Sequence, residues 1–285
     1  MAEKYQESDI LWIFGHPRSG TTWMAKLLAD WLDSYLWNEP GIGHCVTFRN
    51  NLERNDPLRL DDPTFWFSTP LRNAWQPALN SFFHDIISRC SPEHSEDGYL
   101  LIKEPNSSYV APLIAEIMPK SKIIVMIRDP RDVTASLIDA RRPGSWMAER
   151  LTTEFDRNQI VRQTVGRFQN LGVKLRDLRE QAAPGQLYEM HYERLRADTE
   201  SQLRHLSHVF GLEVDDERLA AAIKANSYEN VPVAERGPGQ FVRNAKVGGW
   251  ANELTGDEIE FIETNLRRFL SEHGYLEERA TPATA

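Results

Sequence analysis

A glycine-bounded loop near the start of the chain carries residues that could bind an anion. Gly15 and Gly20 enclose four residues and are followed by Thr21 and Thr22, which is the glycine spacing of the P-loop that binds nucleoside triphosphates. That pattern requires a lysine directly after the second glycine, where this sequence has a threonine. Arg18 lies inside the loop and could supply the missing positive charge from another side. The residues therefore predict phosphate-type chemistry that differs from that of an ordinary ATPase.

The residues on either side of this loop predict how it is positioned. Residues 10–14 form an unbroken apolar run typical of a buried strand, and residues 23–31 have apolar side chains at helical spacing. A strand, a tight loop and a helix in this order place the anion at the helix N-terminus. The first N–H groups of a helix lack intrahelical acceptors and the helix dipole is positive there, so an anion is favoured at that end.

Two more arginines stand at positions where a ligand could collect. Arg128 directly follows residues 122–127, the clearest buried strand in the chain, and Arg243 lies in a glycine-bearing basic loop, residues 241–250. Ligands of open α/β sheets gather at the carboxyl ends of the strands. We expect the loops that carry Arg18, Arg128 and Arg243 to converge there on a ligand with more than one phosphate group.

The remaining pattern predicts an α/β fold. Further strands are expected at 98–103 and 187–192, and the expected helices are 109–118, 146–182, 199–210, 220–224 and one that begins with a capping box at 255–258. This alternation predicts a central parallel sheet with helices on both faces, similar to the P-loop nucleotide triphosphatases. Residues 36–44 are expected to form a turn-rich segment. Residues 56–91 are rich in aromatic side chains, which either form an ordinary helical core or line an acceptor pocket.

Composition narrows the class of protein. The 285 residues are 41% hydrophobic and 26% charged, which suits one large domain; we expect it to span residues 1–278, with a disordered tail at 279–285. The net charge of −9 argues against general nucleic-acid binding. Cys45 and Cys90 have neither metal-ligand spacing nor the pattern of a disulfide framework. The polar N-terminus shows no signal peptide or membrane anchor, so a cytoplasmic protein is expected.

On these motifs the sequence resembles the sulfotransferases that use 3′-phosphoadenosine-5′-phosphosulfate (PAPS), over residues 10 to about 275. Residues 17–23 resemble the family's loop for the 5′-phosphate and the sulfuryl group. The resemblance implies that this end of the donor is bound by Arg18, Ser19, Gly20, Thr21, Thr22 and Trp23.

The same resemblance extends to the other end of the nucleotide. Residues 128–136 resemble the family's 3′-phosphate motif, and residues 241–250 resemble the late loop that closes over the same phosphate. The residues implied in 3′-phosphate binding are Arg128, Ser136, Arg243 and Asn244. Tyr192 and Tyr228 fall, like Trp23, where the family places groups beside the adenine and its ribose.

The chain also departs from the cytosolic branch of the family. Arg18 replaces a lysine, as in the tyrosylprotein and several bacterial branches. The histidine base that follows the second strand in the cytosolic branch is absent, because the run here is Lys103-Glu104-Pro105. The late loop keeps Arg243 but lacks the usual Arg-Lys-Gly triplet. The short dimerisation motif of that branch is not apparent in residues 235–240, so the oligomeric state stays open.

The resemblance implies in-line sulfuryl transfer to an acceptor hydroxyl, with no metal needed. Arg18 is our choice for stabilising the leaving 5′-phosphate oxygen, with help from Lys103. Glu39, a carboxylate one helix and one return after Arg18, is our choice for the base, with Glu104 and His44 as the alternatives. The aromatic segment at 56–91 suggests an apolar small-molecule alcohol or phenol as acceptor.

Two other classes of function fit parts of the pattern. The chain could be a small-molecule kinase with a degenerate P-loop, although the missing lysine argues against it. It could also be a non-catalytic nucleotide-binding or scaffold protein. Transfer of phosphate from ATP with magnesium would indicate the first, and binding of adenosine 3′,5′-bisphosphate (PAP) without any transfer would indicate the second.

Overall fold

The computed structural model describes residues 5–32, 34–91, 98–148, 154–213, 215–243 and 245–276. Its contacts divide the chain into two compact units, the first formed by residues 1–127 and 173–230 and the second by 128–172 and 231–285. The single domain expected over residues 1–278 stays a prediction. The tail expected at 279–285 lies outside the described residues.

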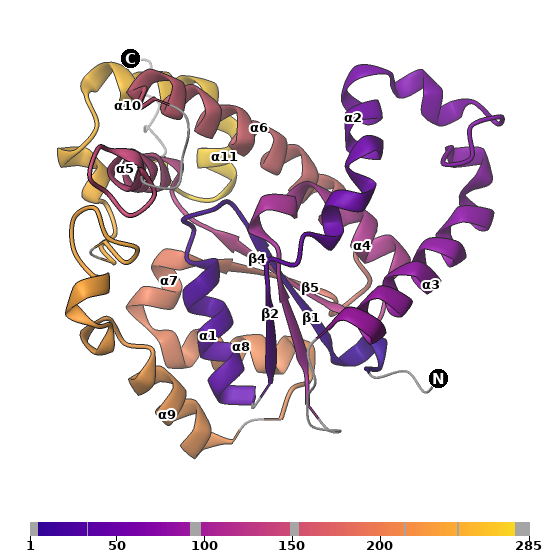
Figure 1. The fold of residues 1–285 in the computed structure, drawn as a ribbon, viewed down its shortest axis with the longest axis horizontal. Helices are drawn as coiled ribbons and strands as arrows, with labels where there is room; N and C mark the ends of the chain where they lie inside the picture. The colour runs from indigo at the N-terminus through magenta and orange to yellow at the C-terminus, as the bar shows by residue number, and fades with distance from the viewer. Residues whose placement is uncertain are drawn as a thin grey trace, which may run out of the picture. The chain divides into compact units, whose positions relative to one another are not determined.

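The first unit is built on a parallel sheet (Figure 1). Its five described strands lie in the order β2-β3-β1-β4-β5. Their bounds are Ile10–Gly15 for β1, Tyr35–Asn38 for β2, Leu100–Lys103 for β3, Lys122–Ile127 for β4 and Leu187–His191 for β5. From β1 the chain goes to the edge strand β2, returns to β3 beside β1, and then crosses to β4 and β5 on the other side. The carboxyl end of β1 therefore lies at a topological switch point, where open sheets bind their ligands. The predicted central parallel sheet is confirmed.

Helices pack on both faces of this sheet, as expected. On one face, α1 (Thr21–Leu32), α7 (Tyr192–Ala197), α8 (Thr199–Phe210) and α9 (Asp216–Ala225) cover Leu11 and Ile13 of β1. Trp12 points to the opposite face because side chains alternate along a strand. Its ring lies 6.4 Å from that of Phe83, which comes from α3 (Arg72–Cys90). Helix α4 (Ala111–Ile117) contacts α3.

The aromatic-rich stretch divides between core and surface. The 3-10 helix η2 (Ile42–Val46) and helix α2 (Thr47–Asn55) precede it, and the stretch itself holds the 3-10 helices η3 (Pro57–Asp61) and η4 (Thr69–Leu71) and then α3. Trp75 and Phe83 are buried on α3, as the core interpretation predicts. Trp66, however, is 54% exposed and stacks on Phe67 with ring centroids 4.6 Å apart. Part of this stretch therefore presents aromatic rings to solvent.

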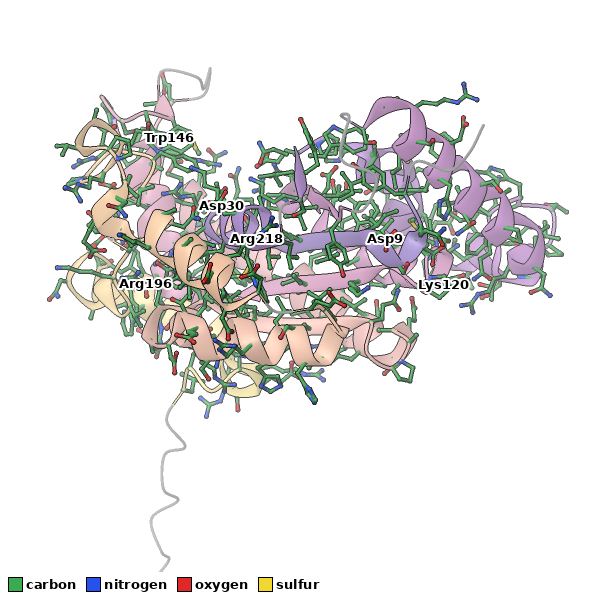
Figure 2. The ribbon with its side chains drawn as sticks, turned by 90° about the horizontal axis from the view of Figure 1, so that it is seen from below. Asp9, Asp30, Lys120, Trp146, Arg196 and Arg218 are labelled. Atoms are coloured by element: carbon green, nitrogen blue, oxygen red, sulfur yellow. The ribbon has the colours of Figure 1, made fainter. Side chains whose placement is uncertain are left out.

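The two edges of the sheet differ in what they carry. Asp9 and Lys120, labelled in Figure 2, precede β1 and β4 and so mark the amino-terminal edge. The 3-10 helix η1 (Glu7–Asp9) is fixed at this edge by a bond from the Lys120 N–H to Glu7, 2.5 Å. The glycine loop follows the carboxyl end of β1, at the opposite edge. The 3-10 helices η5 (Pro105–Val110) and η7 (Tyr228–Asn230) complete the first unit's described short elements.

The second unit consists of helices and loops among its described residues. These are α5 (Pro130–Arg141), η8 (Val233–Glu235), η9 (Gly249–Asn252), α10 (Gly256–Asn265) and α11 (Arg267–Glu272). Helix α6 (Arg157–Gln181) begins in this unit and ends in the first. The rings of Phe168 and Phe269 meet edge to face, 5.2 Å apart. No helix in the described ranges is both long and apolar enough to cross a membrane.

Most predicted elements are confirmed, with two corrections. Strand β2 overlaps the segment 36–44, which we expected to be rich in turns. The strand is short, two of its four residues are exposed, and Pro40 and Gly41 follow soon after its end. The helix expected from residue 146 begins instead at Arg157. The described residues just before it, 154–156, have no regular structure, although Asp156 accepts a bond from the Gln159 N–H at 3.0 Å.

The capping box of α10 gives a test of local stability. Thr255 Oγ1 accepts a bond from the Glu258 N–H, and Glu258 Oε2 accepts one from the Thr255 N–H, 3.3 and 2.8 Å. Thr255→Ala should lower the free energy of unfolding by about 1 kcal/mol, measured by urea denaturation, because the N–H groups of the first turn lose their acceptor. Thr69→Ala, at an exposed position of η4, is the control. Equal losses in the two variants would contradict a stabilising cap.

Candidate active site

The loop between β1 and α1 has a backbone that few residues other than glycine allow. Gly15 and Gly20 have φ values of 138° and 91°. A Cβ atom would lie 2.6 Å from the Met126 carbonyl at the first position and 2.6 Å from the Tyr192 ring at the second. Arg18 also has a positive φ, 74°, which is strained for a residue with a side chain. Both predicted glycines are therefore required by the backbone, and neighbouring groups approach the loop closely.

The loop offers groups suited to an anion. Ser19 is fully buried, and within the described ranges its Oγ atom has no hydrogen-bond partner. Thr21 and Thr22 open helix α1, where the first backbone N–H groups lack intrahelical acceptors. A phosphate or sulfuryl oxygen would satisfy both the serine hydroxyl and these amides. The predicted 5′-phosphosulfate loop thus fits such a group.

A buried lysine joins this loop to the predicted base. Lys103, the last residue of β3, is only 3% exposed. Its Nζ donates to Thr22 Oγ1 at 3.1 Å and to Glu39 Oε1 at 2.7 Å. The structure therefore brings together three residues that the sequence analysis assigned separately to the donor loop, to charge stabilisation and to the base.

Glu39 is held at the carboxyl end of β2. Its N–H donates to the Lys103 carbonyl at 2.9 Å, continuing the parallel pairing of β2 with β3. Its φ of 53° turns the chain away from the sheet at this residue. The side chain is 41% exposed, and its second oxygen, Oε2, accepts a bond from Asn106 Nδ2 at 3.2 Å. One face of this carboxylate thus meets the protein and another meets solvent.

The two alternative bases occupy different environments. Glu104 is 1% exposed, and its Oε1 accepts a bond from the Ile42 N–H at 3.0 Å. Burial raises the pKa of this carboxyl group, although hydrogen bonds from backbone amides oppose the shift. Glu104 thereby fixes the turn that follows Glu39. The more exposed His44 shares a 3.0 Å hydrogen bond between its Nδ1 and the Tyr109 hydroxyl.

Aromatic groups gather on the α1 side of the loop. The Trp23 and Tyr192 rings meet edge to face with centroids 5.9 Å apart, and Trp23 Nε1 donates to the Asn226 carbonyl at 2.9 Å. The guanidinium of Arg196 lies 5.4 Å from the Trp23 ring. Tyr228, two residues after Asn226, is half-buried. The structure thus brings Trp23 and Tyr192, two residues predicted to lie beside the adenine, next to each other and to Gly20.

The predicted 3′-phosphate residues belong to the second unit. Arg128 is 7% exposed and its Nη2 donates to the carbonyl of Lys246 in the late loop, 3.2 Å away. Ser136 is buried on α5. Arg243 is also buried and forms an ion pair with Glu253. Within this unit, the start of α5 and the late loop therefore converge as expected, while Asn244 lies outside the described residues.

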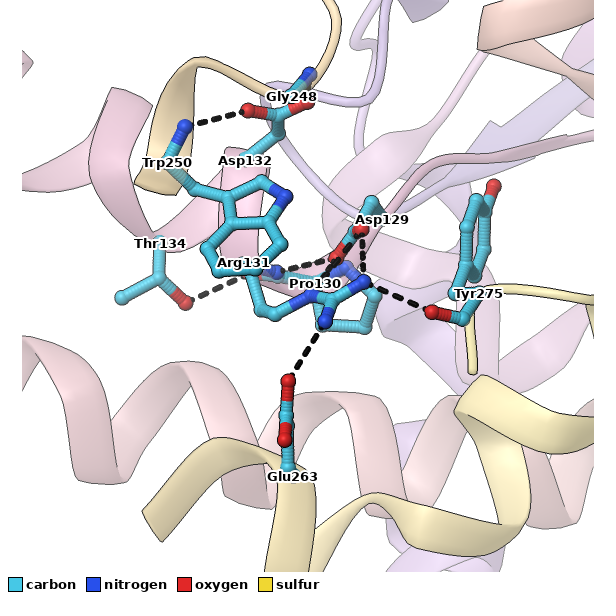
Figure 3. A network of polar contacts seen from close by, with 9 residues as sticks. All are labelled: Asp129, Pro130, Arg131, Asp132, Thr134, Gly248, Trp250, Glu263 and Tyr275. Carbon is cyan, nitrogen blue, oxygen red and sulfur yellow. Dashed lines mark hydrogen bonds and ion pairs between the residues drawn. The ribbon is translucent and has the colours of Figure 1, made fainter. Parts of the chain in front are cut away.

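A network that the sequence analysis did not identify fixes the late loop to α5 (Figure 3). Asp132 accepts bonds from the N–H groups of Gly248 and Trp250, 2.8 and 3.1 Å. The Arg131 guanidinium lies 4.0 Å from the Trp250 ring centroid and donates to Asp129 and Glu263. Burial alone would lower the pKa of Arg131, but these carboxylates raise it above its ordinary value, so the cation persists.

The chain is similar to known sulfotransferases. A model described as the sulfotransferase family matches residues 11–216. A Caenorhabditis briggsae protein whose name assigns it to the protein-tyrosine sulfotransferases is 26% identical over 216 residues, which cover 74% of this chain and 68% of that protein. The omega-hydroxy-beta-dihydromenaquinone-9 sulfotransferase Stf3 of Mycobacterium tuberculosis is 31% identical over 113 residues, 40% of this chain and 29% of that enzyme.

Solved structures share the fold at low sequence identity. The mouse sulfotransferase SULT7A1, solved in complex with PAP, aligns with a TM-score of 0.60 and 14% identity over 94% of this chain and 86% of that chain. The sulfotransferase STF9 from Mycobacterium avium aligns with a TM-score of 0.55 and 14% identity, over 94% and 77% of the two chains. These alignments confirm the predicted α/β architecture.

The buried carboxyl of Glu104 predicts a pH dependence of stability. Because its folded pKa lies above its ordinary value, its stabilising contribution is complete below that ordinary value and is lost as the pH rises through the folded pKa. Glu104→Gln removes this titration, so the variant should gain stability relative to the native protein as the pH rises through that window. Urea denaturation at successive pH values measures the difference. Glu213→Gln, at an exposed position, is the control, and a parallel pH dependence of the native and Glu104→Gln proteins would contradict the assignment.

Proposed function

Because this chain belongs to the sulfotransferase family, we propose that it moves a sulfuryl group from PAPS to a hydroxyl of an apolar small molecule, with Glu39 as the base. The observation that carries the proposal is the position of Lys103. Its single ammonium contacts both Thr22 in the donor loop and the Glu39 carboxylate. A base for the acceptor hydroxyl therefore stands beside the loop that is proposed to hold the sulfuryl group.

Each group of this site has a role in the proposed transfer. Glu39 takes the proton of the acceptor hydroxyl while the hydroxyl oxygen of the acceptor forms a bond to sulfur. The bond between sulfur and the 5′-phosphate oxygen breaks, and PAP leaves with the negative charge that develops on this oxygen. Arg18 and Lys103 stabilise that charge, together with the amides at the start of α1. We expect these groups to suffice without a metal ion.

The donor is proposed to be held at several points. The Ser19 hydroxyl and the close approach allowed at Gly20 support binding of the 5′-phosphosulfate end. Trp23, Tyr192 and Tyr228 are proposed to contact the adenosine. For the 3′-phosphate we propose Arg128, Ser136, Arg243 and Asn244, on the sequence motif. The PAP present in the mouse structure supports this choice of donor.

The acceptor class is proposed from the segment that follows Glu39. Phe48 and Trp66 in this segment are 38% and 54% exposed, with ring centroids 5.8 Å apart. Such rings favour an apolar alcohol or phenol over a charged glycan. The name of the mycobacterial relative gives a hydroxyl compound, omega-hydroxy-beta-dihydromenaquinone-9, as its acceptor. The name of the Caenorhabditis relative points instead to protein tyrosine.

A transfer assay separates these acceptors. The protein is incubated with ³⁵S-labelled PAPS and, in turn, with 2-naphthol, 1-octanol, an isoprenoid alcohol and an acidic tyrosine peptide. Label in naphthol or the alcohols supports the proposal. Label confined to the peptide would contradict it and would indicate a tyrosine acceptor instead. Stabilisation by PAP without any transfer would favour a non-catalytic nucleotide-binding protein. The family match disfavours the kinase alternative, which would require transfer from ATP.

The base assignment predicts the effect of one isosteric change. Glu39→Gln should lower turnover by orders of magnitude, because the amide cannot accept the proton, while the rise in melting temperature caused by PAP stays unchanged. Turnover is measured with the fastest acceptor of the panel. Glu104→Gln and His44→Gln are compared in the same assay. Near-normal turnover in Glu39→Gln would move the role of the base to Glu104 or His44.

The 3′-phosphate assignment predicts a change in nucleotide preference. Arg128→Ala should weaken PAP binding by about tenfold or more, because a charge-assisted contact to phosphate is lost. Binding of AMP, which lacks the 3′-phosphate, should change little. Calorimetric titration with both nucleotides measures the ratio of affinities. Arg267→Ala, at an exposed position of the same unit, is the control; equal weakening of PAP and AMP by Arg128→Ala would contradict the assignment.

A further inference from the structure

We propose that Asn106 is the positioning residue that orients the Glu39 carboxylate for proton transfer. This inference rests on the proposed role of Glu39 as the base. It concerns the first residue after Pro105, in the short 3-10 helix η5, which no sequence motif singled out. Asn106 Nδ2 donates to Glu39 Oε2 at 3.2 Å and so holds the oxygen that Lys103 does not contact.

The division of the two carboxylate oxygens suggests why a second donor is needed. Lys103 holds Oε1, but the same ammonium also donates to Thr22 in the donor loop. An anion in that loop would attract the ammonium, because opposite charges interact strongly where water is excluded. The bond from Asn106 is independent of that competition, since its amide is neutral and does not contact the loop's threonine. The Asn106 bond therefore keeps the Glu39 carboxylate in place when the Lys103 ammonium contacts the anion bound in the donor loop.

The side chain of Glu39 needs such a restraint. It is 41% exposed, and its backbone has the positive φ of 53°. A half-exposed carboxylate held by a single contact can rotate toward water. A general base must instead lie within hydrogen-bond reach of the proton that it removes. Two bonds to different oxygens fix both the position and the plane of the carboxylate.

Asn106 itself stands on a rigid support. The N–H of the preceding Glu104 donates to the Ile13 carbonyl at 2.9 Å. Ser108, two residues after Asn106, is bonded through Oγ to both the N–H and the carbonyl of Gly15, 2.9 and 2.8 Å. The segment from Lys103 to Ser108 is thus fixed to the start of the donor loop. Asn106 therefore sets the position of the base relative to the same loop that is proposed to hold the sulfuryl group.

The test compares two substitutions at an exposed position, where folding should be unaffected. Asn106→Ala removes the donor and should lower kcat about tenfold. Asn106→Asp has the same shape but places a negative charge beside Glu39, so it should lower kcat further, about 100-fold. The KM for PAPS, the stabilisation by PAP and the melting temperature should stay unchanged in both. Asn73→Ala and Asn73→Asp, at an exposed position of α3, are the matched controls. Transfer of ³⁵S label to the fastest acceptor of the panel measures kcat.

A double-mutant cycle completes the test. In a Glu39→Gln background, the large loss caused by Asn106→Asp should disappear, because there is no longer a carboxylate to repel. The proposal is supported if kcat falls from the native protein to Asn106→Ala and further to Asn106→Asp, and if Asn106→Asp has no such effect in the Glu39→Gln background. Equal kcat values for the native protein and both Asn106 variants, with turnover of Glu39→Gln lowered by orders of magnitude, would overturn the positioning role and leave the base assignment intact. Native-like turnover in Glu39→Gln would overturn both.

Discussion

The buried ammonium of Lys103 is the interaction on which the proposed site depends. A lysine that is 3% exposed has lost most of its hydration, so its charge must be met by protein groups or by a ligand. Here the partners are a hydroxyl at the start of α1 and a carboxylate at the end of β2. Both lie beside the end of β3 because β1, β2 and β3 are parallel neighbours whose carboxyl ends share one edge. The sheet therefore determines which donor-loop residue and which acid can meet.

Backbone constraints complete the arrangement. The tight approach of Met126 and Tyr192 leaves room only for glycine at positions 15 and 20, and Ser108 fixes Gly15 from the β3 side. The buried Glu104 holds the turn that follows Glu39 through the Ile42 N–H. In the second unit, Asp132 and Arg131 fix the late loop against the start of α5 in the same manner, through two backbone amides and a stacked tryptophan. The donor loop and the late loop are thus also held by residues such as Ser108 and Asp132, for which no contact with the nucleotide is proposed.

The sequence was sufficient for features that depend on local pattern. Four features were predictable: the strands β1 and β4, the helix after the glycine loop and the capping box of α10. Their signals are the spacing of apolar residues, of glycines and of cap residues, and each depends only on residues close together in the sequence. Strand β2 was not, since four exposed or half-buried residues shortly before a proline resemble a turn. Neither was Asn106: its contact with Glu39 joins residues far apart in the chain, and an asparagine after a proline is ordinary in a loop. Asn106 reaches Glu39 only because strands β2 and β3 are paired, which the local sequence does not reveal.

A crystal structure of the protein with PAP tests most directly the claim that the loop after β1 holds the donor beside Glu39. We expect oxygens of the 5′-phosphate to lie within hydrogen-bond distance of Ser19 Oγ and the first amides of α1, with the Lys103 ammonium on the same side. A 5′-phosphate bound away from residues 15–22, or one separated from Lys103 and Glu39 by other side chains, would contradict it.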